Sequence, residues 1–196
     1  SMIFGFILAS ALLSMWISNT ATTLMMLPIA TSVVLLLNKD GNEEQHKRFA
    51  LIAMLAIAYG ANIGGIGTLV GTPPNAAMAG ILSEQYNINI GFGEWMSIAA
   101  PFSLVLLFLV YFLLVYVVHP VKNEKTASGD AMISTEIKKL GKLSSPQFKV
   151  LMIFCTTAFL WMFRGLINEY LLVKLDDTMI SIAAAVFLFV VPSELN

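Results

Sequence analysis

Long apolar runs dominate the chain, and a short polar stretch interrupts the first of them. The apolar segments 2–17 and 24–37 are separated by Ser18–Thr23, a run of hydroxyl and amide side chains. A helix that crosses a bilayer needs about 20 apolar residues, so each arm is too short to span alone. The pattern fits a re-entrant helical hairpin over 1–37, with its tip at the middle of the membrane. It fits equally one long tilted helix in which the hydroxyls bond to their own helix's carbonyl groups.

A second interruption lies in the apolar segment 49–82. Gly60–Asn75 contains five glycines and the pair Pro73-Pro74. Each glycine costs about 1 kcal/mol of helix stability relative to alanine, and an interior proline costs about 3 kcal/mol. Backbone that is not helical is tolerated in a membrane only where protein covers it or where it lines a watery cavity. We therefore expect a broken transmembrane helix with a binding site at the break.

The remaining segments alternate between polar loops and apolar spans. A charged loop covers 38–48, a full span covers 95–119, a lysine-rich loop covers 120–147, and two further helices occupy 148–192. Nine of the eleven basic residues lie in or beside the two loops, which predicts that both loops are cytoplasmic. The predicted fold is an all-α polytopic membrane protein with a re-entrant hairpin, one broken transmembrane helix and about three full spans.

Composition supports a membrane protein and excludes several other classes. Of 196 residues, 58% are hydrophobic and 12% are charged, against about 25% charged in a typical soluble domain. We expect a multi-pass integral protein of the plasma or inner membrane. The net charge of −1 gives no reason to expect a nucleic-acid partner. Cys155 alone forms neither an internal disulfide nor a zinc site. With no buried carboxylate pair, metal cluster or Ser/His dyad in view, we expect no enzyme activity.

Neither polar interruption contains a charged side chain, and this limits the chemistry of a site. Proton relays and salt-bridged substrates normally need an ionisable residue inside the membrane. Broken helices instead offer N-terminal N–H groups, which attract anions, and unpaired carbonyl groups, which suit a hard cation such as sodium. Thr72 followed by Pro73 predicts the start of a new half-helix. The spacing Gly60-x-x-x-Gly64 has a second interpretation, in which the glycines serve helix packing alone.

The two interruptions resemble the paired motifs of the divalent anion:sodium symporter family. Residues 15–30, with the sequence Ser-Asn-Thr at Ser18–Thr20, resemble the first motif, and Gly64–Asn75 resembles the partner motif in an unwound helix. The resemblance implies a re-entrant hairpin over 1–37 that belongs, with 49–119, to a mobile transport domain. It also implies scaffold helices over 148–192 through which homodimers form, and an elevator mechanism in an inverted-repeat protein.

The resemblance also implies roles for individual residues. It assigns sodium binding to Ser14, Ser18, Asn19 and Gly67, and assigns one substrate carboxylate to Asn19 and Thr20, with Thr68 as an adjacent candidate. Structural alternatives stay open at this point for four of the hydroxyl and amide residues. Ser14 could only back-bond to its own helix, and the side chains of Thr22, Thr23 and Asn75 could only cap helix ends.

The family's second repeat, with another hairpin and another broken helix, is absent from this sequence. The expected function is therefore that of the central fragment of a sodium-coupled symporter for succinate, citrate and similar di- or tricarboxylates. Such a fragment contributes one sodium site and half of the substrate site, and does not transport alone. A sulfate symporter or a sodium-independent anion exchanger of the same family is the alternative. A non-transporting membrane scaffold is the alternative from another class.

Overall fold

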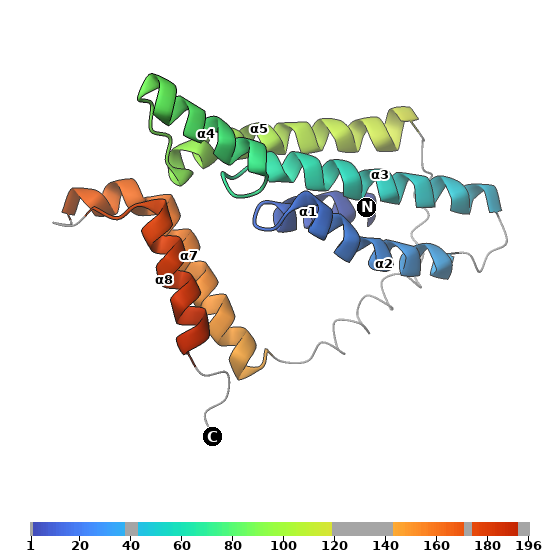
Figure 1. Ribbon diagram of the computed structural model, residues 1–196. Coiled ribbons are helices and arrows are strands. Elements are labelled where there is room, and N and C mark those ends of the chain that lie inside the picture. The colour runs from blue at the N-terminus through green and yellow to red at the C-terminus, as the bar shows by residue number, and fades with distance from the viewer. Residues whose placement is uncertain (1, 38–42, 119–142, 171–173, 192–196) are drawn as a thin grey trace. The chain divides into compact units, whose positions relative to one another are not determined.

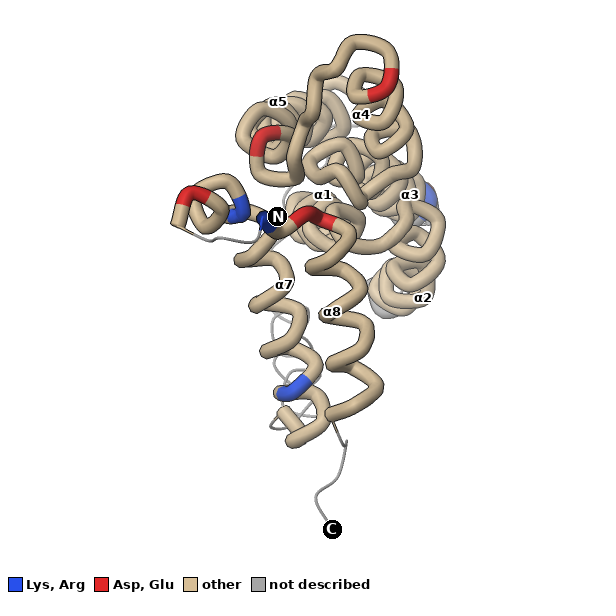
Figure 2. The backbone as a smooth tube through the Cα atoms, turned by 60° about the vertical axis from the view of Figure 1, so that its left-hand side comes forward, with Lys and Arg blue, Asp and Glu red and all other residues tan. Residues whose placement is uncertain are grey.

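The computed structural model describes residues 2–37, 43–118, 143–170 and 174–191, and all regular elements in these ranges are helices. Of the predicted loops, 38–42 and 120–142 lie outside the described residues, whereas 43–48 and 145–147 are helical and were wrongly assigned to loops. The chain divides into two compact units, Ser1–Lys122 and Asn123–Asn196, each of which is described by itself. In the part of the first unit that the structure describes, charged residues lie near helix ends (Figure 2).

The first unit begins with two helices that run in opposite directions (Figure 1). Helix α1 (Met2–Ser14) and helix α2 (Asn19–Leu37) are joined by a short turn at 15–18. The segment therefore forms a helical hairpin, and the single continuous helix is wrong. The re-entrant position of this hairpin in a bilayer stays a prediction.

The polar stretch Ser18–Thr23 does not separate the two helices as a free loop. Ser18 precedes α2 as its N-cap: its carbonyl accepts from the Thr22 N–H at 3.0 Å and its hydroxyl accepts from the Ala21 N–H at 3.3 Å. The rest of the stretch forms the first turns of α2. A side-chain oxygen that accepts a backbone N–H is the usual way to start a helix, so the motif itself sets where α2 begins.

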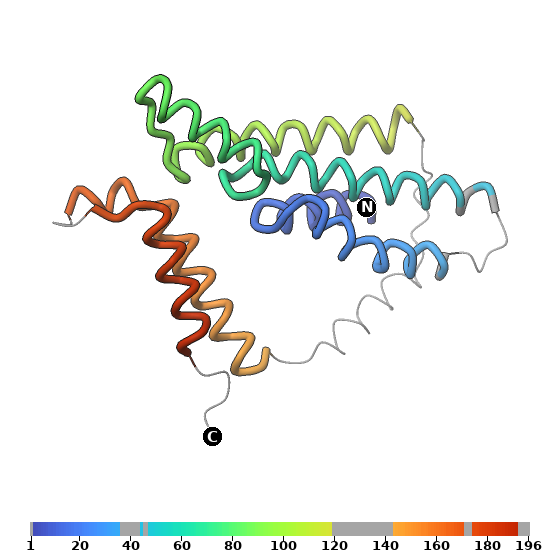
Figure 3. Tube along the Cα trace, viewed as in Figure 1, coloured from blue at the N-terminus to red at the C-terminus, as the bar shows by residue number. Residues whose placement is uncertain are grey.

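The interrupted helix is broken over a shorter stretch than the glycines predict. Helix α3 (Glu43–Ile66) continues past Gly60 and Gly64, and only residues 67–72 are unwound before helix α4 (Pro73–Tyr86) begins (Figure 3). As predicted, Thr72 is the N-cap of α4, in an extended conformation with φ −148° and ψ 141°, although its side chain makes no capping hydrogen bond.

The glycines inside α3 allow a close approach to α1. A Cβ atom on Gly60 would lie 2.7 Å from the carbonyl oxygen of Ile7, and one on Gly64 would overlap the backbone of Ala11. The packing interpretation is therefore correct for these two glycines, because their lack of a side chain lets the two helix backbones touch. It does not explain why residues 67–72 are unwound.

The core of the first unit lies where α1 meets its neighbours. The most extensive helix contact joins α1 to α3, and both helices also contact α2 and helix α5 (Phe92–Phe112). The core is apolar and rich in alanine and isoleucine; its members include Ile3, Phe6, Ile7, Ala11, Met26, Ala30, Ile52, Ala53, Ala56, Ile57 and Leu107. This packing fixes the axial position of the hairpin turn relative to the end of α3.

Helix α5 begins three residues earlier than the predicted span, at Phe92, where the Glu94 carboxylate accepts from the Gly91 N–H at 2.9 Å. It contains Pro101 and continues as a π-helical segment, η2 (Leu113–Val118). By length and composition, three helical stretches of the described chain are candidate membrane spans: Lys47–Ile66, Phe92–Val118 and Ser145–Tyr170.

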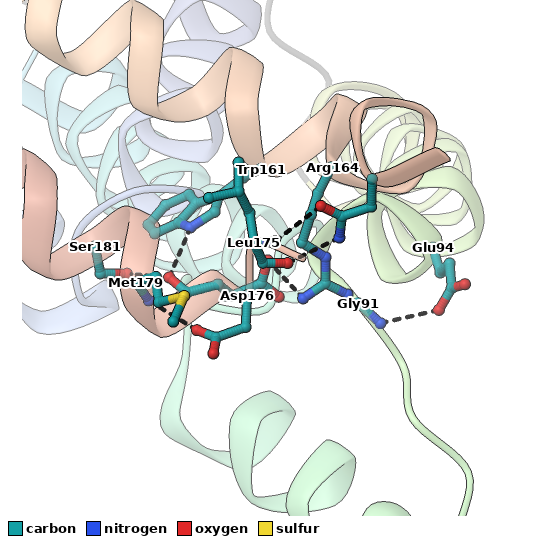
Figure 4. A network of polar contacts seen from close by, with 10 residues as sticks. Gly91, Glu94, Trp161, Arg164, Leu175, Asp176, Met179 and Ser181 are labelled. Atoms are coloured by element: carbon teal, nitrogen blue, oxygen red, sulfur yellow. Dashed lines mark hydrogen bonds and ion pairs between the residues drawn. The ribbon is translucent and has the colours of Figure 1, made fainter. Parts of the chain in front are cut away.

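The second unit is a pair of helices held together by polar contacts at their connection (Figure 4). Helix α7 (Ser145–Tyr170) is longer than predicted, and helix α8 (Asp177–Val190) has 14 residues, fewer than a full span needs. Arg164 pairs with the Asp177 carboxylate at 3.1 Å, and the Trp161 indole N–H donates to the Asp177 carbonyl at 3.1 Å. Asn168 bonds both backbone groups of Leu175.

Candidate ion- and anion-binding site

The turn of the α1–α2 hairpin lies against the break after α3. The Thr68 hydroxyl donates to the Met15 carbonyl in the turn and accepts from the Gly71 N–H at 3.1 Å. Thr68 is fully buried. Its hydroxyl therefore joins the two interruptions directly and uses both its donor and one acceptor position in doing so. The two motifs that the sequence singled out separately are one structural site.

Asn19 occupies the centre of this site. Its side-chain oxygen accepts from the Ser14 hydroxyl at 2.6 Å, and its NH₂ group donates to the side-chain oxygen of Asn62 at 3.0 Å. Only a glycine fits opposite, because a Cβ atom on Gly65 would overlap the Asn19 side-chain oxygen. Ser14 is buried and directs its hydroxyl at Asn19, so the interpretation that it only back-bonds to α1 is wrong.

The carbonyl groups released at the end of α3 are bonded by two side chains. The Asn75 amide donates to the carbonyls of Gly65 at 2.9 Å and Thr68 at 2.8 Å, and the Trp95 indole donates to the Ile66 carbonyl at 2.9 Å. The capping interpretation of Asn75 is therefore confirmed. In the described part of the chain, no donor meets the carbonyl of Gly67. That oxygen remains available to a cation.

The other hydroxyl residues of the first motif are exposed, internally bonded or, in one case, buried without a described partner. Ser18 and Thr20 are exposed at the start of α2. The Thr23 hydroxyl donates to the Asn19 carbonyl at 2.8 Å, within the first turns of α2. Thr22 is fully buried, and its hydroxyl has no hydrogen-bond partner among the described residues. The structure therefore bonds Ser14 to Asn19, bonds Thr68 to the Met15 carbonyl in the same turn, and leaves Thr20 exposed at the start of α2.

Helix ends provide the charge distribution of the site. The C-terminal ends of α1 and α3 each carry about half a negative charge, and the N-terminal end of α2 carries about half a positive charge. The N–H groups of Asn19 and Thr20 precede the first intrahelical hydrogen bond of α2, which runs from Thr22 to Ser18. A cation therefore fits beside Ser14 and the end of α3, and an anion fits beside the first turn of α2.

Two residues of the network were missed by the sequence reasoning. Asn62 lies in the last turns of α3 and was taken only as the edge of the glycine-rich stretch, yet it bonds to Asn19. Trp95 is the first residue of the predicted span 95–119, and the sequence gave no sign of its contact with Ile66, 29 positions away. Both contacts depend on how three helices pack, which a hydropathy pattern does not specify.

Fold and site together define a class: a polytopic membrane protein in which a helical hairpin and a discontinuous helix meet at an uncharged polar site, the arrangement found in secondary transporters. Residues 1–193 match the family described as the sodium:sulfate symporter transmembrane region. The chain belongs to this family, and it is an integral membrane protein.

Similar proteins are named as sodium-dependent dicarboxylate transporters. The chain is 32% identical over 200 residues to SdcS of Staphylococcus saprophyticus subsp. saprophyticus, an alignment that covers 97% of the chain and 38% of the relative. SdcS of Staphylococcus aureus strain USA300 gives the same identity and coverage. These relatives are transporters and not enzymes, in agreement with the prediction. The chain spans 38% of the length of these relatives.

Proposed function

We propose that this chain forms one half of the binding site of a sodium-coupled symporter for dicarboxylates of the succinate type, and also for citrate. The observation that carries the proposal is the contact between the Ser-Asn-Thr turn and the unwound end of α3. There, the Asn19 side chain, bonded to Ser14, lies against Gly65, and the carbonyl of Gly67, two residues further along, accepts no hydrogen bond in the described part of the chain. The family and the named relatives support sodium coupling and a dianionic substrate.

Sodium binds, on this proposal, between the hydroxyl of Ser14, the side-chain oxygen of Asn19, the carbonyl of Gly67 and backbone or hydroxyl oxygen from Ser18. All are neutral oxygen ligands, which a hard cation accepts. The hydroxyl oxygen of Ser14 and the side-chain oxygen of Asn19 lie 2.6 Å apart and are joined by a hydrogen bond. A cation that binds both oxygens therefore has to replace only this one hydrogen bond. The negative ends of α1 and α3 add a favourable field.

The substrate carboxylate binds at the start of α2. The backbone N–H groups there, the Asn19 amide and the Thr20 hydroxyl are donors that suit a carboxylate, and Thr20 is exposed. Thr68 is the adjacent candidate, and its observed bonds to Met15 and Gly71 support a role in holding the two interruptions together. A bound sodium ion beside Asn19 attracts the dianion, which couples the two ligands.

We further propose that the hairpin is re-entrant, that residues 1–119 move as a transport domain in an elevator mechanism, and that α7 and α8 belong to a scaffold that forms a homodimer. The extensive α1–α3 contact, fixed by glycines, supports movement of the hairpin and broken helix as one body. Sulfate is the second candidate substrate, because the description of the family names it. Sodium-independent exchange is the second candidate mechanism.

The test is uptake of radiolabelled succinate by the full-length protein in liposomes. With an inward sodium gradient, uptake should exceed that seen with choline, and Asn19→Ala and Thr20→Ala should each abolish or strongly reduce it. Intact uptake in both variants would refute the site. If uptake is unchanged when choline replaces sodium, sodium-independent exchange is favoured. If sulfate competes with succinate more strongly than citrate does, a sulfate carrier is favoured.

A further inference from the structure

Asn62 is the residue that contacts the centre of the site from the opposite element, and neither the motif nor the family resemblance assigns it a role. It lies on α3, one helical turn before Ile66, and its side chain is exposed. Its amide oxygen accepts from the Asn19 NH₂ group at 3.0 Å, across 43 residues of sequence.

The orientation of the Asn19 amide decides whether this side chain can bind a cation. The oxygen and the NH₂ group of an asparagine are nearly equal in size and opposite in polarity. In the structure, the oxygen lies toward Ser14 and Gly65, and the NH₂ group lies toward Asn62. A rotation of the amide by half a turn would place N–H donors where sodium needs an oxygen ligand. An acceptor at position 62 holds the amide in the orientation that binds sodium.

We propose that Asn62 is a positioning residue for sodium: it fixes the Asn19 amide so that the oxygen faces the cation. The inference rests on the proposed sodium site. The Ser14 hydroxyl cannot fix the amide alone, because a hydroxyl both donates and accepts and so satisfies either end of the amide. Asn62 is itself an amide, but the end that it presents to Asn19 is its oxygen, which accepts only from the NH₂ group and so holds the Asn19 oxygen toward Ser14.

The experiment measures sodium-driven succinate uptake by the full-length protein carrying Asn62→Leu, which keeps the shape of the side chain and removes the acceptor. Loss of one neutral hydrogen bond corresponds to about a fivefold change in an equilibrium constant. The sodium concentration for half-maximal uptake of succinate should therefore rise about fivefold. Asn89→Leu, an exposed asparagine that accepts from Ser83 at 2.6 Å, is the matched control and should match the wild type.

A double-mutant cycle separates positioning from a general structural effect. In an Asn19→Asp background both carboxylate oxygens can face the cation, so orientation no longer matters. In this background, Asn62→Leu should change the sodium concentration for half-maximal binding by less than twofold. Sodium binding is measured on the purified protein. An equal shift in both backgrounds would overturn the inference.

Asn62→Asp keeps an acceptor at this position and remains informative if the leucine variant does not fold. It should bind sodium at least as tightly as the wild type, and a severalfold weaker affinity would overturn the inference. A wild-type protein that shows no sodium dependence would instead refute the proposed function. Sodium dependence in the wild type, with no change in Asn62→Leu, would refute only the role of Asn62.

Discussion

Gly64→Ala tests whether the contact between α1 and α3 places the two interruptions together. The new Cβ atom would overlap the backbone of Ala11, and backbone gives way less easily than a flexible side chain. Overpacking of this kind costs about 1–3 kcal/mol, and a rigid neighbour favours the upper end. Replacing a helical glycine by alanine returns about 1 kcal/mol of helix stability. We therefore expect a net loss of about 2 kcal/mol in the free energy of unfolding.

Gly80→Ala is the matched control, because Gly80 lies in the interior of α4 and a Cβ atom there has no neighbour within 4 Å. This variant should be about 1 kcal/mol more stable than the wild type, so the two alanine variants should differ by about 3 kcal/mol. The assay is denaturant unfolding of the full-length protein in detergent, followed by tryptophan fluorescence. Equal stability of Gly64→Ala and Gly80→Ala would refute the packing argument.

Three further substitutions test separate parts of the site. Asn75→Ala leaves the carbonyl groups of Gly65 and Thr68 without their donor. The same unfolding assay should show a free energy of unfolding lower by about 2–4 kcal/mol. A loss below about 1 kcal/mol would contradict the capping role of Asn75. Ser14→Ala should raise the sodium concentration for half-maximal uptake about tenfold. Thr31→Ala should leave it unchanged, because the Thr31 hydroxyl bonds only the Leu27 carbonyl of its own helix. Equal effects of the two substitutions would contradict a role of Ser14 as a sodium ligand. Trp95→Phe keeps the aromatic packing and removes the donor to Ile66, so it should cost about 1–2 kcal/mol of unfolding free energy; no measurable loss would show that this bond does not hold the break.

Much of the fold follows from the sequence because the bilayer limits the possible structures. The short apolar arms separated by polar residues fitted the helix pair α1–α2 and one long helix equally, and the family resemblance favoured the pair. Thr72-Pro73 predicted the start of α4. The start of α2 was placed too late, because apolar runs were counted and the capping role of Ser18 was not. Helix ends set by side-chain capping are not visible in hydropathy.

The extent of the break was overestimated for a physical reason. Helix propensity counts every glycine as a penalty, but Gly60 and Gly64 serve a tertiary contact that outweighs it, and α3 stays helical through both. The sequence identified the motif residues of the site; in the structure Ser14 bonds Asn19, and Thr68 bonds the Met15 carbonyl in the same turn. Asn62 and Trp95 came from the structure alone, since both act across long sequence separations.

The central claim is that the start of α2 binds the substrate anion together with sodium. The most direct measurement uses Ala21→Cys, beside Thr20 in the first turn of α2, in a full-length protein otherwise free of cysteine, labelled with a membrane-impermeant thiol reagent in liposomes. Succinate should slow labelling of this position in sodium and leave it unchanged in choline, and labelling of Thr31→Cys should not respond to succinate in either. If succinate does not slow the labelling of Ala21→Cys in sodium, in a variant that labels readily, the account is contradicted.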